Sequence, residues 1–398
     1  MSIQTTKKLR IGISYDRPEE YPEVVGPADC FAEFEPESTI LAMEDAIRWI
    51  GAVPVRVGGP RPLLHHRPEV DLIWNISEGY GSKNREGWVP LICDVYRIPC
   101  LGSDAFTMNL SLDKSATKKV AQSLGIQTSP WGIARYKDGF EENYIQQISQ
   151  KVIHKISLYS SRQMDPDLGY GNNGGNLESD EKQLSSFNPD ESIQMWPLFV
   201  KPCYEGTGKG ITTSSIVHNV DELASEIERQ FMLYKQDLIV ELFLNGPEFT
   251  VALSGNPLLC HPVLERGLDA KTGIGMHVLD AVRSREGGLN NPKPQENHAF
   301  DAEKDIEYSL SHSLNHHLEE KIQYWSRLLC TEMRVLDFAR LDFKMDGNGQ
   351  LHFLEINTLP TFAVDNNFAI LAELRGVSYE SFLGDILESA VRRIGFDI

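Results

Sequence analysis

The sequence lacks paired cysteines, long apolar runs and clustered basic residues. Its six cysteines are scattered, without a CxxC pair or zinc-type spacing, which predicts reduced thiols in a cytoplasmic protein. No stretch approaches the roughly 18 apolar residues that a membrane span needs. The first 16 residues also lack the apolar core, of roughly 7–15 residues, that defines a signal peptide. These absences argue against a secreted or membrane-spanning protein.

Basic residues are outnumbered, with 38 Lys and Arg against 57 Asp and Glu and a net charge of −19. A surface that binds nucleic acid needs clustered Lys and Arg to neutralise phosphates, so nucleic acid is excluded as the main partner. Small molecules remain as partners. A site for a small phosphate compound would depend on a few well-placed cationic side chains.

The pattern along the chain predicts an α/β fold of two or three units. Strand-like segments at 8–14, 53–59 and 71–77 alternate with a helix that begins near Ser38 and ends at Gly51, which is typical of a parallel sheet covered by helices. Another helix is expected over Ser111–Leu124. Residues 158–192 are rich in Gly, Asn, Asp and Ser and cannot bury much apolar surface. We predict a mobile surface insertion there, or alternatively an active-site flap.

Four polar side chains flank the strongest hairpin signal, the turn at 346–349 (DGNG). Arg340 and Asp342 lie two apart on one predicted strand, and Glu355 and Asn357 lie two apart on the other. Residues two apart share a face of a strand, so the four groups could converge. Two carboxylates and an amide oxygen suit Mg²⁺. The alternative is a solvated strand face with ordinary salt bridges.

A second candidate site follows the strand that ends at Lys201. Gly206, Gly208 and Gly210 let a backbone approach phosphates closely and direct N–H groups at them. The spacing is not that of a Walker A loop, and a flexible hairpin tip is the alternative. Lys114, near the start of a predicted helix, could also reach a phosphate or simply be solvated. Two glutamates at 241 and 248 flank a later turn.

The order of these elements resembles the ATP-grasp superfamily, and in particular the D-alanine–D-alanine ligases. The resemblance covers most of the chain except residues 15–34, 158–192 and about 266–310. It is carried by segments that include LFVKPCYEGTGKGI, LIVELFLNGPEFTVAL and FARLDF…LHFLEINTLP. It implies an N-terminal substrate domain at 1–103 and two further domains, at 104–243 and 244–398, that clamp ATP. It also implies a homodimer.

Carried over to this sequence, the resemblance implies roles for the nucleotide and metal residues. Lys114 and Lys201 would hold the α- and β-phosphates of ATP. Glu241 and Leu244 would line the adenine pocket, and Glu248 would bind the ribose. The phosphates would be covered by a loop that includes Glu205, Gly206, Thr207, Gly208 and Gly210. Two Mg²⁺ (or Mn²⁺) ions would be held by Asp342, Glu355 and Asn357, with Arg340 stabilising an acyl phosphate and a tetrahedral intermediate.

The substrate side departs from the family pattern. Glu35 is the candidate for binding the first substrate's ammonium group, and Lys271 for the loop that covers the site. Further candidates replace or flank the family's substrate residues: Glu78, Arg85, Glu86, Thr361, Asn366 and Asn367. We therefore expect a ligase that joins amino-acid or peptide substrates other than two D-alanines. The alternatives are a D-alanine–D-alanine ligase proper and a non-catalytic ATP-binding sensor.

Overall fold

The N-terminal unit is built on a parallel four-stranded sheet. The computed structural model describes residues 8–163, 195–268, 272–275, 308–310 and 314–397. The strands lie in the order β2-β1-β3-β4, with β1 (Arg10–Ser14), β2 (Val53–Arg56), β3 (Leu72–Asn75) and β4 (Cys100–Leu101). Between them run α1 (Glu37–Trp49), α2 (Pro60–His65) and α3 (Trp88–Tyr96), preceded by a short 3-10 turn η1 (Pro18–Glu20). The predicted parallel sheet is confirmed.

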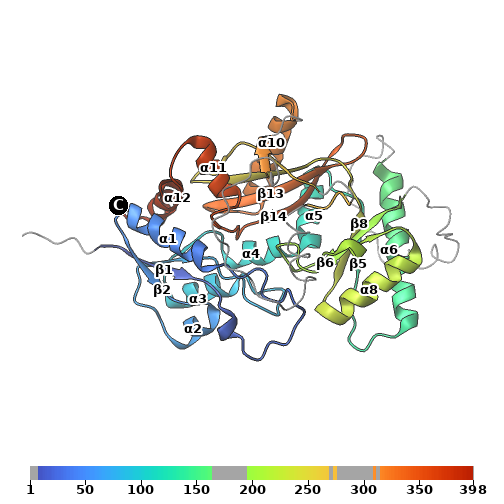
Figure 1. Ribbon diagram of the computed structural model, residues 1–398, viewed down its shortest axis with the longest axis horizontal. Helices are drawn as coiled ribbons and strands as arrows, with labels where there is room; N and C mark the ends of the chain where they lie inside the picture. The colour runs from blue at the N-terminus through green and yellow to red at the C-terminus, as the bar shows by residue number, and fades with distance from the viewer. Residues whose placement is uncertain (1–7, 164–194, 269–271, 276–307, 311–313, 398) are drawn as a thin grey trace, which may run out of the picture.

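The central unit is a four-stranded antiparallel sheet with two helices packed on it (Figure 1). Its strand order is β5-β8-β6-β7, with β5 (Trp131–Ala134), β6 (Leu198–Pro202), β7 (Ile216–Val217) and β8 (Leu238–Leu242). The helices are α6 (Glu142–Gln163) and α8 (Val220–Tyr234), and a 3-10 turn η3 (Thr213–Ser215) precedes β7. Alternate apolar residues of the strands, including Leu198, Val200 and Val240, pack against both helices.

The C-terminal unit is a larger antiparallel sheet. Its order is β12-β11-β9-β13-β14, with β10 paired to β9. The strands are β9 (Glu248–Ser254), β10 (Leu259–Cys260), β11 (Leu264–Arg266), β12 (Tyr308–Leu310), β13 (Phe338–Met345) and β14 (Leu351–Asn357). The associated helices are α4 (Ala105–Leu112), α5 (Lys114–Ser123), α10 (His316–Glu332), α11 (Asn367–Arg375) and α12 (Tyr379–Ile394).

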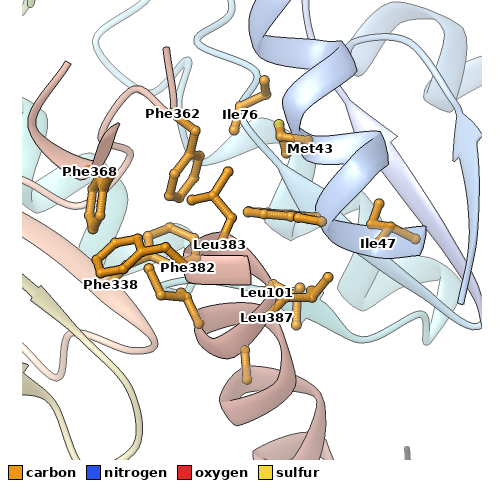
Figure 2. Close-up of a cluster of buried hydrophobic side chains, with 14 of the residues drawn as sticks. Met43, Ile47, Ile76, Leu101, Phe338, Phe362, Phe368, Phe382, Leu383 and Leu387 are labelled. Atoms are coloured by element: carbon orange, nitrogen blue, oxygen red, sulfur yellow. The ribbon is translucent and has the colours of Figure 1, made fainter. Parts of the chain in front are cut away.

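The largest core joins the two ends of the chain. Figure 2 shows Phe362, Phe368, Phe382 and Leu383 gathered with Met43 of α1 in one cluster. Helix α12 packs along α1, so residues from the last strand onward complete the core of the first sheet. The domain boundaries expected at 103/104 and 243/244 stay predictions. Helices α4 and α5 pack against β14, a contact that the sequence pattern does not predict.

Two expectations about elements need correction or limits. The helix expected over Ser111–Leu124 is two helices, because Asp113 leaves the helical conformation and caps α5. Residues 158–163, expected to belong to a surface insertion, are the last residues of α6, which continues to Gln163; residues 164–192 lie outside the described part of the chain. The strands on either side of Asn245 belong to different sheets. All six cysteines are free, and no helix in the described residues is long and apolar enough to cross a membrane.

Candidate active site

The β13–β14 hairpin brings its four predicted site residues together. In the strand register Arg340 lies opposite Asn357 and Asp342 lies opposite Glu355, with an irregularity just after Asp342. The Arg340 guanidinium donates to Asp342 Oδ2 at 3.1 Å. The convergence predicted from residue spacing is therefore present, with a cation beside two carboxylates and an amide.

The two carboxylates and the amide suit a hard cation. Burial acts to raise the pKa of Asp342, but Arg266 and Arg340 outweigh it and hold that pKa below its usual range. Burial also opposes ionisation of Glu355, whose pKa is nevertheless lowered by Lys114 and Lys201. The amide oxygen of Asn357 accepts one hydrogen bond, from the Leu359 N–H at 2.9 Å, and keeps a second lone pair. Ionised carboxylates and an amide oxygen are ligands that Mg²⁺ accepts. In the described residues no cluster of three or more His, Cys, Asp or Glu side chains forms a separate metal site.

Two lysines enclose Glu241 at the centre of the molecule. Lys201 Nζ, at the end of β6, lies 2.7 Å from Glu241 Oε1, and Lys118 Nζ of α5 lies 2.9 Å from Oε2. The Ser129 hydroxyl also donates to Glu241 Oε2 at 2.9 Å. Burial acts to raise the pKa of Glu241, but the two ammonium groups hold it far below its ordinary value. A fixed anion thus positions two cations: Lys201 lines a pocket, whereas Lys118 is fully buried behind it.

Lys114 is the first residue of α5 and reaches across to the Gly-rich loop. Its ammonium donates to the Glu205 carbonyl and lies 3.7 Å from Glu355 Oε2. Asp113 fixes this helix start by accepting from the N–H groups of Ser115 and Ala116. Lys114 therefore links the Gly-rich loop to the hairpin, and its role in binding phosphate stays a prediction.

Glu248 begins β9 beside two further cations. Arg266 Nη1 of β11 and Lys344 Nζ of β13 each lie 3.2 Å from its carboxylate. Lys344 also donates to the Gly273 carbonyl at 2.8 Å. Leu244 is buried nearby in the pocket wall. The carboxylate expected to meet a ribose is thus held in place by ion pairs.

One pocket between the central and C-terminal sheets is lined by Lys114, Lys201, Glu241, Glu248, Asp342 and Glu355. Its walls combine the lysines and carboxylates with apolar groups, including Phe199, Phe243, Leu244 and Ile274. Apolar walls beside a cationic end are what an adenine ring and a phosphate chain require. The cavity measures about 120 Å³, less than the roughly 300–1,000 Å³ of typical small-molecule sites. The Gly-rich loop forms part of its wall.

The Gly-rich loop, residues 205–210, directs two of its N–H groups toward the N-terminal unit. Gly206 N donates to Glu33 Oε1 at 2.6 Å, and Gly210 N donates to Asp29 Oδ2 at 3.0 Å. Thr207 and Gly208 form the tip, both with positive φ. The expectation that the loop's N–H groups face phosphates stays a prediction; in this structure the N–H groups of Gly206 and Gly210 donate to carboxylates of the N-terminal unit.

The loop after β3 contacts Glu33, the carboxylate that also accepts from Gly206 of the Gly-rich loop. Arg85 is buried and pairs with Glu33 at 2.5 Å and with Glu78 at 3.0 Å. Burial raises the pKa of Glu86 to about 7, against the opposing effect of Arg85. Glu78, Arg85 and Glu86 are thus brought together, in an ion cluster that also contains Glu33.

Two further substrate candidates, Glu35 and Thr361, lie together at a second site. The Thr39 hydroxyl donates to Glu35 at 2.8 Å, and Thr361 also bonds to that carboxyl. Burial raises the pKa of Glu35 above its ordinary value. Asn366 caps α11. Glu35 and Thr361 are therefore neighbours, as a shared substrate role would require.

Two other substrate candidates do not join this pair. Asn367 is buried and donates to the hydroxyl of Thr250 at 2.9 Å. Thr250 lies on β9, the strand that pairs with β13 of the β13–β14 hairpin. Lys271 lies outside the described residues.

Several site residues are not found by reasoning from the sequence. Lys118 had a signal, since it lies one helical turn after Lys114, and Lys209 lies within the glycine-rich motif. Glu33 and Asp29 had none, because they belong to a polar segment without periodicity. Arg266 and Lys344 sit in strands whose sheet partners only the fold reveals.

Comparison with known proteins shows similarity to D-alanine–D-alanine ligases. The family model for the D-ala D-ala ligase C-terminus matches residues 176–272 and 295–388. The chain is an ATP-grasp protein of the D-alanine–D-alanine ligase-like kind. D-alanine–D-alanine ligase B of Clostridium tetani is 23% identical over 328 residues, which cover 81% of this chain and 72% of that protein. A D-alanine–D-alanine ligase of Legionella pneumophila is 27% identical over 202 residues, 49% of each chain.

Solved structures share the fold of this D-alanine–D-alanine ligase-like protein. The D-alanine–D-alanine ligase of Bacillus anthracis complexed with ATP superimposes with a TM-score of 0.60 at 17% identity, covering 97% of this chain and 98% of the other. The VanG D-Ala:D-Ser ligase of Enterococcus faecalis gives 0.61 at 16% identity, covering 97% and 100%. The predicted fold class is confirmed, and the protein is an ATP-dependent ligase that forms a C–N bond.

Proposed function

We propose that this protein activates a substrate carboxylate with ATP and joins it to an amine. A carboxylate oxygen attacks the γ-phosphorus, the bond to the β–γ bridging oxygen breaks, and ADP leaves. The amine nitrogen then attacks the acyl carbon of the acyl phosphate, phosphate leaves, and the ammonium product loses a proton. The observation that carries the proposal is the single pocket that joins Lys114 and Lys201 to the Asp342–Glu355 hairpin.

The chain's own residues supply position and charge. Lys114 and Lys201 would bind the phosphates, and Arg340 would face the charge that develops on the transferring group and on the tetrahedral carbon. Asp342, Glu355 and Asn357 would hold two Mg²⁺ ions, which would neutralise phosphate charge. Little covalent chemistry falls to the protein, so its contribution is orientation and electrostatic stabilisation.

The substrates we propose are amino acids or peptides other than two D-alanines. The support is the altered substrate side, where Asn367 is buried against Thr250 and the loop after β3 carries an ion cluster around Arg85. The names of the relatives favour the alternative, D-alanine with D-alanine. Glu35 beside Thr361 would bind an ammonium group in either case. A cytoplasmic location and a homodimer stay predictions.

The first test is release of phosphate from ATP and Mg²⁺ with a panel of D- and L-amino acids, singly and in pairs, with mass spectrometry of the products. A mixed or L-configured product would support the proposal, and D-alanyl-D-alanine as the main product would refute the substrate class. Glu355→Gln should abolish ADP formation while ATP still binds. Failure of the wild type to form ADP with any pair would favour a sensor that binds ATP without catalysis.

A further inference from the structure

The segment between β1 and α1 reaches out of the N-terminal unit and contacts the Gly-rich loop. Two of its carboxylates touch the loop backbone: Glu33 at Gly206 N (2.6 Å) and Asp29 at Gly210 N (3.0 Å). Asp29 also accepts from the Tyr234 hydroxyl at 2.9 Å, at the end of α8. Both ends of the loop are therefore attached to a part of the chain that lies outside the central sheet.

The contact at Glu33 is a buried ion network. The Glu33 carboxylate is paired with Arg85 at 2.5 Å and with Lys209 of the loop itself at 3.3 Å. Lys209 also pairs with Glu205 at 2.6 Å. Burial acts to raise the pKa of Glu33, but Arg85 and Lys209 outweigh it, so the group is ionised at neutral pH. Charge-assisted hydrogen bonds of this kind are about twice as strong as neutral ones.

We infer that Glu33 and Asp29 are positioning residues that hold the Gly-rich loop over the phosphate end of the pocket before any nucleotide arrives. The inference rests on the proposed function for its catalytic meaning, but the position of the loop is a property of the free protein. The loop is held because N-terminal carboxylates bind two of its N–H groups and Lys209.

A loop held in this way has a specific consequence for the reaction. An acyl phosphate exposed to water is hydrolysed, so the loop must exclude water between the two steps. ATP enters only when the Glu33 and Asp29 contacts open, and re-forming them encloses the phosphates. Weakening the contacts should therefore ease ATP entry but let water reach the intermediate, so that ADP is formed without product.

The test is amide hydrogen exchange of residues 205–210 in the free protein, in wild type and in Glu33→Gln and Asp29→Asn. We expect exchange at Gly206 in the first variant, and at Gly210 in the second, to rise about ten- to a hundredfold. Glu37→Gln, which changes an exposed carboxyl that pairs with Arg56 on the N-terminal unit, is the matched control and should leave the loop unchanged. Thermal unfolding establishes that each variant is folded, and Asp29→Asn keeps the test open should Glu33→Gln fail to fold.

A non-hydrolysable ATP analogue with Mg²⁺ gives the second measurement. In wild type it should add little protection to the loop, whereas in Glu33→Gln it should restore protection. With an active substrate pair, the ratio of ADP to product should rise in both variants while the KM for ATP does not increase. Unchanged exchange in both folded variants, or strong protection of wild type by the analogue, would overturn the inference. An analogue that fails to bind would refute the proposed nucleotide site, yet the exchange of the free protein would still decide the role of Glu33 and Asp29.

Discussion

Glu241 balances two buried ammonium groups, those of Lys118 and Lys201. Glu241→Gln would leave both cations buried with only a neutral partner, and breaking a buried ion pair typically costs about 3–5 kcal/mol. We expect a loss of that size in the free energy of unfolding, measured by urea denaturation. Glu388→Gln, which breaks an exposed pair with Arg392, should cost under about 1 kcal/mol. Equal losses in the two variants would show that Glu241 is not the charge balance described.

Glu86 makes the stability of the protein depend on pH. Burial raises the pKa of Glu86 from 4.5 to about 7, so its contribution is fully present below pH 4.5 and is lost as pH rises toward 7. Glu33, with its pKa lowered, stays ionised throughout this window. We expect the contribution of Glu86 to the stability of wild type to be lost between about pH 4.5 and 7, by an amount of the order of a few kcal/mol. Glu86→Gln should flatten that decline in the melting temperature; an identical decline in both proteins would contradict the assignment.

Thr250 connects Asn367 to Asp342 of the β13–β14 hairpin. It lies opposite Asp342 in the strand register and hydrogen-bonds to it, while its hydroxyl accepts from Asn367 at 2.9 Å. Thr250→Val removes the donor that orients Asp342, and loss of such a supporting contact typically weakens metal binding about ten- to a hundredfold. Mn²⁺ binding followed by electron paramagnetic resonance should show this loss, whereas Thr250→Ser should retain near wild-type affinity. Equal affinity for Val and Ser would mean that the hydroxyl is not used.

Residue spacing predicted the hairpin site because alternation along a strand fixes which side chains share a face. Arg340, Asp342, Glu355 and Asn357 could be placed together from their spacing alone. The same reasoning could not find Glu33 or Asp29, whose partners are 173 and 181 residues away along the chain. A carboxylate in a segment without periodicity has no local signal of what it will meet.

At the scale of elements, the start of α5 sets the position of Lys114. Asp113 accepts from two N–H groups at the helix N-terminus, and replacing such a cap by alanine costs about 0.5–2 kcal/mol. Asp113→Ala should lower the melting temperature and weaken binding of an ATP analogue, because Lys114 is the next residue. Asp113→Asn keeps a good cap and should bind the analogue nearly as wild type does. Calorimetric titration with the analogue measures its affinity for the three proteins. Unchanged affinity in Asp113→Ala would show that the cap does not set the position of Lys114.

Element boundaries were predictable where apolar periodicity and a stop signal agreed, as for the helix expected from Ser38 to Gly51: α1 runs over Glu37–Trp49 and Gly51 has a positive φ. The single helix expected over Ser111–Leu124 failed because an Asp within a helical pattern can either continue it or cap a new one. The strands on either side of the turn at 245–247 are neighbours in the sequence, yet they belong to separate sheets. Local sequence does not show which neighbour a strand will pair with.

At the scale of the whole molecule, Asp337 ties three distant segments together. Its carboxylate accepts two bonds from Arg393 of α12, both at 2.6 Å, and one from Gly102 N at 2.8 Å. Asp337→Ala leaves the buried Gly102 N–H without that acceptor and Arg393 without its partner. We expect the free energy of unfolding, measured by chemical denaturation, to be about 2–4 kcal/mol lower than in wild type. Arg392→Ala, at the neighbouring but exposed position, should change little, and similar losses in both would argue against the tie.

The core that α12 shares with α1 has a consequence for how the protein is made. Trp74 and Ile47 belong to the first hundred residues, yet they are covered by Phe382, Leu383 and Leu387 near the end of the chain. During synthesis, at about 5–20 residues per second, the first sheet leaves the ribosome tens of seconds before the helix that seals it. Its apolar face is therefore exposed to water over that interval, until α12 has been synthesised and can pack on it.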